Sequence, residues 1–160
     1  MKIKSRLIGL AVVCLGIPAT VVAQSKDEGL EGTWLLKMSV HNMPGTISAV
    51  SICNRDGSLE HFDYQPVPRI FGNGAETQLY VGSGSWVRKG NGQFEIKFKS
   101  EVPNRGSQQV EGIATLSASR NEVTGSAKVE FLNQDGTVVY AEPVTVIGHR
   151  APTSGFTAKR

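Results

Sequence analysis

Residues 94–99, with the sequence FEIKFK, alternate strictly between apolar and charged side chains. A two-residue period is typical of a β-strand that buries one face and exposes the other. Turn-forming residues follow the same pattern along the chain, at 54–57, 89–92, 119–122 and 133–136, each between β-rich segments. No stretch beyond residue 23 shows a sustained helical period, so the sequence predicts an all-β protein.

About eight strands follow from this pattern, joined in succession as hairpins. We expect them near 33–41, 47–54, 58–64, 77–88, 93–100, 108–118, 122–132 and 137–149. A meander of this length either closes into a barrel or leaves two edges exposed, and closure removes both edges. The sequence therefore predicts an up-and-down antiparallel β-barrel over 32–150, with a short polar segment at 24–31 and a polar tail at 151–160.

The expected connections differ between the two ends of this barrel. The first, third and fifth, at 41–46, 65–76 and 101–107, are long and contain proline, whereas the second, fourth and sixth are tight turns. Binding residues usually lie in long loops on a rigid scaffold, so we expect an open mouth at the long-loop end and a closed floor at the other. The segment 65–74, which contains Phe71, is expected either to form a lid over the mouth or to fold onto the outer wall.

Trp34 begins the first expected strand and Arg150 ends the last, so both fall at the floor. An indole under a guanidinium would close it by cation–π attraction, worth on the order of 1 kcal/mol. Gly32-Thr33-Trp34 at the head of the barrel, with Arg150 at the end of the stretch 146–150, resembles the signature of the lipocalin and wider calycin families. The resemblance implies a cavity above the floor that binds small, often apolar molecules. The sequence lacks the helix that follows the lipocalin barrel and has no correctly placed Thr-Asp-Tyr motif, so it resembles a bacterial-type lipocalin-like barrel.

The second tryptophan, Trp86, lies in the middle of an expected strand. One face of this strand carries Tyr80, Gly82, Gly84 and Trp86, so two residues without side chains stand between two aromatic ones. Two interpretations stay open: a slot flanked by aromatic rings, or a corner at which the strand bends.

Few residues suggest catalysis. His61 and Asp63 share a strand face and could form an acid–base pair, but Phe62 and Tyr64 are the better core candidates, so we expect the first two to face water. The histidines are scattered, which argues against a metal site, and no Ser/His/Asp order is readable.

The last expected strand contains a carboxyl group of interest. Counting back by twos from Arg150 reaches Glu142 and Tyr140, which would then point inward. An interior carboxyl has a raised pKa and could act as an acid or base or bind a polar ligand. A bulge at Pro143 would reverse the alternation of side chains and turn Glu142 outward. An outward Glu142 is the commoner outcome, because glutamate is rarely fully buried.

Residues 1–23 have the layout of a secretory signal peptide, with a basic start and an apolar stretch at 7–22; lipoprotein processing at Cys14 is the alternative. Cleavage after Ala23 removes three of the 17 Lys and Arg and none of the 14 Asp and Glu, so both counts become 14. This balance argues against nucleic acid as a binding partner and against electrostatic binding to a membrane. We expect an exported, periplasmic or extracellular monomer in which Cys53, the one remaining cysteine, is buried.

The function expected from these features is the binding of a small apolar or amphipathic organic molecule in the barrel, without a cofactor. Two alternatives stay open: an enzyme of the cyclase or isomerase kind that uses Glu142 or Tyr140, and a filled barrel that acts through its surface. The expected ligand contacts are Met38, Val40, Met43, Phe62, Tyr64, Phe71, Tyr80, Trp86, Phe98, Tyr140 and Glu142.

Overall fold

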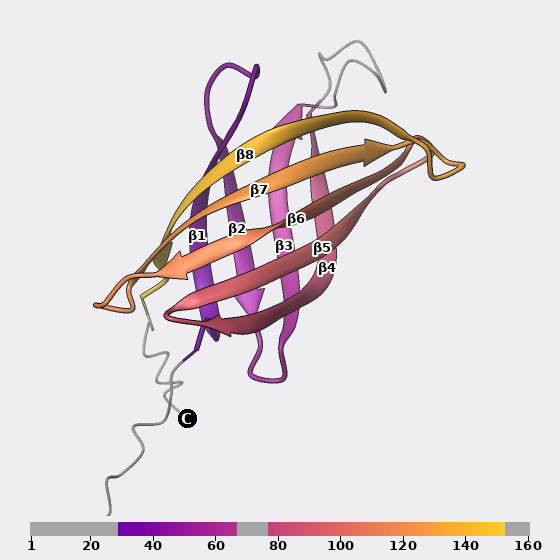
Figure 1. The fold of residues 1–160 in the computed structure, drawn as a ribbon. Helices are drawn as coiled ribbons and strands as arrows, with labels where there is room; N and C mark the ends of the chain where they lie inside the picture. The colour runs from indigo at the N-terminus through magenta and orange to yellow at the C-terminus, as the bar shows by residue number, and fades with distance from the viewer. Residues whose placement is uncertain (1–28, 67–76, 153–160) are drawn as a thin grey trace, which may run out of the picture.

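In the computed structural model, which describes residues 29–66 and 77–152, the chain forms eight β-strands. Each strand pairs antiparallel with the next, and β8 pairs with β1, so the sheet closes into a barrel (Figure 1). The predicted eight-stranded barrel is confirmed. The strands are β1 (Gly32–Val40), β2 (Ile47–Cys53), β3 (Ser58–Pro66), β4 (Thr77–Gly90), β5 (Gln93–Val102), β6 (Gly106–Leu116), β7 (Glu122–Leu132) and β8 (Val138–Arg150).

Several predictions concern segments outside the described residues. They are the signal peptide at 1–23, most of the polar segment at 24–31, most of the segment 65–74 expected as a lid or outer-wall loop, including the mouth residue Phe71, and most of the tail at 151–160. Within 29–66 and 77–152, no helix is long and apolar enough to cross a membrane.

Connections alternate between the two ends of the barrel. Those after β2, β4 and β6 lie toward the lower and left side of Figure 1, and those after β1, β5 and β7 lie toward the upper and right side. The tight turns contain glycines with positive φ, such as Gly57 (87°) and Gly92 (73°), a conformation that glycine adopts without steric cost. The end with the turns after β2, β4 and β6 is the predicted floor. The prediction of a long fifth connection at 101–107 is wrong, because β5 ends at Val102 and β6 begins at Gly106, which leaves only residues 103–105 between them.

The floor is closed by Trp34 and Arg150, which are paired across β1 and β8. Trp34 is only 1% exposed, and Arg150 Cζ lies 4.5 Å from the centroid of the indole. The indole N–H donates to the carbonyl of Leu30 at 2.8 Å, and the guanidinium donates to the carbonyls of Glu31 and Arg120. The predicted floor is therefore confirmed.

Gly32 makes this closure possible. A Cβ atom at residue 32 would lie 2.5 Å from Arg150 Nη1, and the backbone φ of 124° is one that side-chain-bearing residues rarely adopt. The glycine two residues before Trp34 is thus required first by its backbone conformation, and it also leaves room for the guanidinium.

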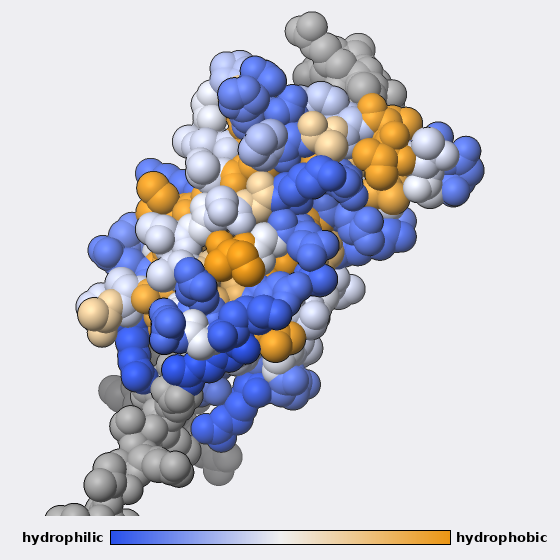
Figure 2. Space-filling view, viewed as in Figure 1, coloured by the Kyte–Doolittle hydropathy of each residue, from blue (hydrophilic) through white to orange (hydrophobic). Residues whose placement is uncertain are grey.

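The core fills the barrel in two clusters of buried side chains, one around Trp34 near the floor and one nearer the mouth. The first contains Leu30, Trp34, Cys53, Leu59, Phe94, Phe98 and Val123; the second contains Met38, Ile47, Ala49, Val129, Phe131 and Val144. On the outer face seen in Figure 2, apolar side chains form separate patches among hydrophilic ones.

Gly84 marks a corner, which decides between the two interpretations of the Trp86 strand. A Cβ atom on Gly84 would lie 1.9 Å from the carbonyl oxygen of Lys97 and 2.5 Å from Phe98 Cα, so the backbone of β5 occupies this space. No slot remains. Trp86 is half-buried beside the bend, where it packs edge-on against Phe94 at 5.7 Å and donates to the carbonyl of Asn54 at 3.0 Å.

The phase of β3 is the reverse of the predicted one. His61 and Asp63 point into the barrel and are 1% and 2% exposed, whereas Tyr64 is 64% exposed on the outer wall. The predictions that Phe62 and Tyr64 line the interior, and that His61 and Asp63 face water, are therefore wrong. The cause is the register with β2, in which Leu59 pairs with the buried Cys53. Because side chains alternate along a strand, every second residue after Leu59 also faces the interior.

Candidate ligand-binding cavity

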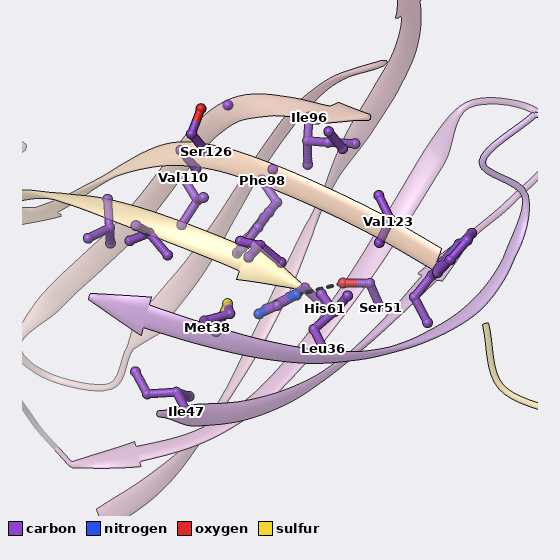
Figure 3. Close-up of a pocket in the computed structure, with 18 of the residues that line it drawn as sticks. Leu36, Met38, Ile47, Ser51, His61, Ile96, Phe98, Val110, Val123 and Ser126 are labelled. Atoms are coloured by element: carbon purple, nitrogen blue, oxygen red, sulfur yellow. Dashed lines mark hydrogen bonds between the residues drawn. The ribbon is translucent and has the colours of Figure 1, made fainter. Parts of the chain in front are cut away.

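The barrel encloses a cavity of about 90 Å³ above the floor. Its lining comes from every strand except β4, and most of it is apolar (Figure 3). One water molecule needs roughly 10–15 Å³, whereas pockets for drug-sized ligands measure roughly 300–1,000 Å³. The cavity therefore suits a molecule of few heavy atoms, and the flexible thioether side chains of Met38 and Met43 in its wall allow some adjustment.

The cavity lies against a part of the wall that has almost no side chains. Gly112 and Ala114 on β6 pair with Ala127 and Gly125 on β7, and all four line the cavity. A Cβ atom on Gly112 would lie 2.4 Å from the carbonyl oxygen of Ser126 and 2.5 Å from the Cβ of Ala127, so the strands leave no space for a side chain there. We call these four residues the small-residue wall.

A hydrogen-bonded chain of polar side chains lies inside the barrel on β2, β3 and β6. His61 Nδ1 is 2.8 Å from Ser51 Oγ, and His61 Nε2 is 3.2 Å from Asp63 Oδ2. Gln65 Nε2 donates to Asp63 Oδ1 at 3.1 Å and to Gln108 Oε1 at 2.9 Å. All five side chains are buried, and we call them the polar network.

The polar network faces the cavity. Ser51, His61, Gln65 and Gln108 line it, while Asp63 lies behind them. The imidazole of His61 stacks on Phe98, with 4.2 Å between ring centroids and 25° between the planes, which fixes the orientation of the ring. Figure 3 shows His61 and Ser51 joined by their hydrogen bond, with Leu36 and Met38 beside them.

Further polar groups are buried next to the network. Tyr80 pairs with Asp63 across β3 and β4, and burial raises the pKa of its phenol to about 12, with a smaller contribution from the Asp63 charge and an opposing one from Arg105. Tyr80 and Ser100 are fully buried, and neither hydroxyl has a hydrogen-bond partner within the described part of the chain. This side of the interior is thus polar, in contrast to the small-residue wall.

Ser51, His61 and Asp63 have the connectivity of a hydrolase triad, an arrangement that no motif in the sequence indicated. Acyl transfer also needs donors aimed at the developing oxyanion. Ser51 lies in the middle of β2, where the backbone N–H groups lie in the plane of the sheet and do not point into the barrel. The arrangement is therefore suited to binding a polar group more than to nucleophilic catalysis.

Four of the predicted contact residues line the cavity: Met38, Val40, Met43 and Phe98. Tyr80 and Trp86 lie on the inner face of β4 as expected, but neither reaches the cavity. Cys53 lines it as well and is buried as expected, and burial raises the pKa of its thiol to about 12.

Tyr140 and Glu142 lie near the mouth, outside the cavity lining. The pairing of β8 with β7 continues without a bulge through Pro143, so Glu142 keeps the phase of the buried Val144 and is half-buried. Its carboxylate accepts hydrogen bonds from the Tyr140 hydroxyl at 3.0 Å and from Asn42 Nδ2 at 3.2 Å. Burial and this acceptor together raise the pKa of Tyr140.

Sequence reasoning missed the small-residue wall and the polar network. The wall had a readable signal, because Gly112 and Ala114 stand two residues apart on one strand and Gly125 and Ala127 do so on the next. In the ranges 29–66 and 77–152, no three His, Cys, Asp or Glu side chains gather closely enough to hold a metal ion.

Comparison with known proteins identifies the fold and no family. No protein-family model matches the chain, and no curated protein matches it. Among solved structures, the chain is similar to a redesigned β-barrel, with 17% identity over 77% of this chain and 92% of that chain and a TM-score of 0.51. Similarity at this level of identity supports the barrel architecture alone.

Two further similar structures contain a bound dye. EF1p2_mFAP2b bound to DFHBI is 17% identical over 76% of this chain and 94% of that chain, with a TM-score of 0.54. The redesigned β-barrel mFAP1 bound to DFHBI is 15% identical over 76% and 94%, with a TM-score of 0.51.

Proposed function

We propose that the protein is an exported, monomeric, lipocalin-like barrel that binds a small, largely apolar organic molecule in its interior. The observation that carries the proposal is the apolar cavity of about 90 Å³ beside the small-residue wall. Interiors of proteins are normally close-packed, so a fold that leaves four small residues facing one another keeps this space at a cost in stability. Two barrels of similar fold bind a dye, which supports a binding role for this architecture.

Titration of the labelled protein with toluene, followed by NMR, tests the proposal. Toluene is expected to shift the resonances of cavity residues such as Met38 and Val129 in a saturable manner. Ala127→Leu adds three carbon atoms to the wall at a position that lines the cavity, so it should weaken toluene binding by roughly tenfold or more while the barrel stays folded. Unchanged affinity in this variant would refute the cavity as the binding site.

Export is a separate part of the proposal, and it rests on the layout of residues 1–23. Protein recovered from a bacterial host that exports it is expected to begin at Gln24, which N-terminal sequencing measures. A chain that retains Met1 and stays in the cytoplasm would contradict export without affecting the binding role.

A further inference from the structure

We infer that the cavity selects small molecules that carry one hydrogen-bond donor, a hydroxyl or an N–H group, and that Ser51 Oγ accepts this donor. The inference rests on the proposed binding function and adds the chemical class of the ligand. A phenol or a small alcohol with an apolar body fits this class.

The direction of each hydrogen bond in the polar network supports it. An Asp63 carboxylate can only accept, and it receives one donor on each oxygen, from His61 Nε2 and from Gln65 Nε2. When the single ring proton of His61 is on Nε2, Nδ1 is an acceptor. We therefore assign the single hydroxyl proton of Ser51 to the 2.8 Å hydrogen bond with Nδ1.

This assignment leaves Ser51 with acceptor capacity toward the cavity. A hydroxyl has one donor and two acceptor lone pairs, and the donor is used. Ser51 is 6% exposed and lines the cavity, so a ligand inside can reach the oxygen. A hydrocarbon would leave the acceptor lone pairs of Ser51 unused, and a site built to accept a hydrogen bond discriminates against ligands that lack a donor.

Charge makes the selection sharper. An anionic ligand beside Ser51 would lie near the Asp63 carboxylate, which is 2% exposed and two hydrogen bonds away through His61. Like charges in a poorly solvated interior repel strongly. A neutral donor is therefore favoured over a carboxylate of the same size.

The position of the apolar part of the ligand is determined by the side of the cavity opposite the polar network. The small-residue wall on β6 and β7 and the side chains of Val144 and Val146 on β8 present no side-chain hydrogen-bonding group. Thr124 and Ser126 also border the cavity, but both are exposed and alternate with Gly125 and Ala127 along β7, so their hydroxyls belong to the outer face. A ligand with its donor on Ser51 thus places its remaining atoms against aliphatic groups and backbone. This division into one polar end and one apolar body defines the ligand as amphipathic.

The reversed phase of β3 is independent support. The strand buries His61, Asp63 and Gln65, leaves Phe62 half-buried and exposes Tyr64, although the opposite phase would bury more apolar surface. Conflicts between local sequence preference and the fold are expected at functional sites. The conflict here coincides with the wall that carries the polar network.

The test compares toluene, phenol and anisole by NMR titration against the natural protein, Ser51→Ala and Ser100→Ala. The three ligands share one ring, and only phenol has a donor. Ser100 is the matched control because it is a fully buried serine that does not line the cavity. The natural protein is expected to bind phenol roughly threefold to tenfold more tightly than toluene or anisole, the range that one net hydrogen bond contributes. Ser51→Ala should abolish this preference, and Ser100→Ala should keep it.

The outcomes separate the inference from the proposed function. Toluene binding without a phenol preference in the natural protein overturns the inference alone, and so does a preference that survives in Ser51→Ala. Tight binding of anisole equal to that of phenol overturns the donor assignment, because anisole has an oxygen without a proton. If none of the three ligands binds, the proposed function fails and the inference fails with it. The comparison within the natural protein decides the matter even if Ser51→Ala does not fold.

Discussion

Replacement of Trp34 tests the closed floor, on which the enclosed cavity depends. Phe or Trp to Ala changes in a core cost roughly 3–5 kcal/mol, and Trp34 meets this condition because it is 1% exposed. The variant also removes the stacking partner of Arg150, about 1 kcal/mol, and leaves the carbonyl of Leu30 without its 2.8 Å donor, about 1 kcal/mol more. We therefore expect Trp34→Ala to lower the free energy of unfolding by about 5–7 kcal/mol.

A second substitution keeps the experiment quantitative if Trp34→Ala leaves too little stability to measure. Trp34→Phe retains an aromatic ring under the guanidinium of Arg150 but loses the N–H donor to Leu30, so it should cost about 1–3 kcal/mol. Urea unfolding followed by circular dichroism gives both values. A loss below about 1 kcal/mol in Trp34→Ala, or equal losses in the two variants, would refute the role of the indole in closing the floor.

Three further predictions concern single residues. Gly32→Ala should lower the free energy of unfolding, measured in urea, by more than about 1 kcal/mol. The backbone φ of residue 32 is 124°, and a Cβ there would lie 2.5 Å from Arg150 Nη1. A neutral effect would contradict both reasons. The pKa of Cys53 is raised from 9.0 to about 12 in the folded state, so the thiolate forms at lower pH in the unfolded chain. The free energy of unfolding should therefore fall as the pH rises from 9 to 12. The fall should be smaller in Cys53→Ala, and identical pH slopes in the two proteins would argue against a buried thiol. Tyr64→Ser should change the free energy of unfolding by less than about 1 kcal/mol, since this side chain is 64% exposed, and a loss of core magnitude would place Tyr64 inside the barrel.

The architecture was predictable because it depends on patterns that span the chain. Alternation such as that of residues 94–99 and the regular turn chemistry led to eight strands, and the cost of exposed edges led to closure. The floor was predictable because Trp34 and Arg150 stand at the two ends of the meander, which closure brings together as neighbours on β1 and β8.

The site was harder to predict, and β3 shows why. Its sequence has an apolar residue, Leu59, in one phase and two aromatic residues, Phe62 and Tyr64, in the other, so hydropathy alone favours the wrong face. The register with β2 and β4 decides the phase, and that register depends on the neighbouring turns and strands. The small-residue wall was not predicted for another reason: glycine and alanine contribute little to a hydropathy pattern, although here they line the cavity.

The seam between β1 and β8 has a consequence for the synthesis of the protein. It joins residues 34–40 to residues 144–150, which lie more than a hundred positions apart in the chain. Contacts this distant in sequence form late, because a long loop must close before they contribute any stability. A chain emerging from the ribosome can pair β1 with β2 early, but the other edge of β1 stays unpaired until the last strand has been made. We expect a chaperone that shields strand edges to raise the yield of folded protein.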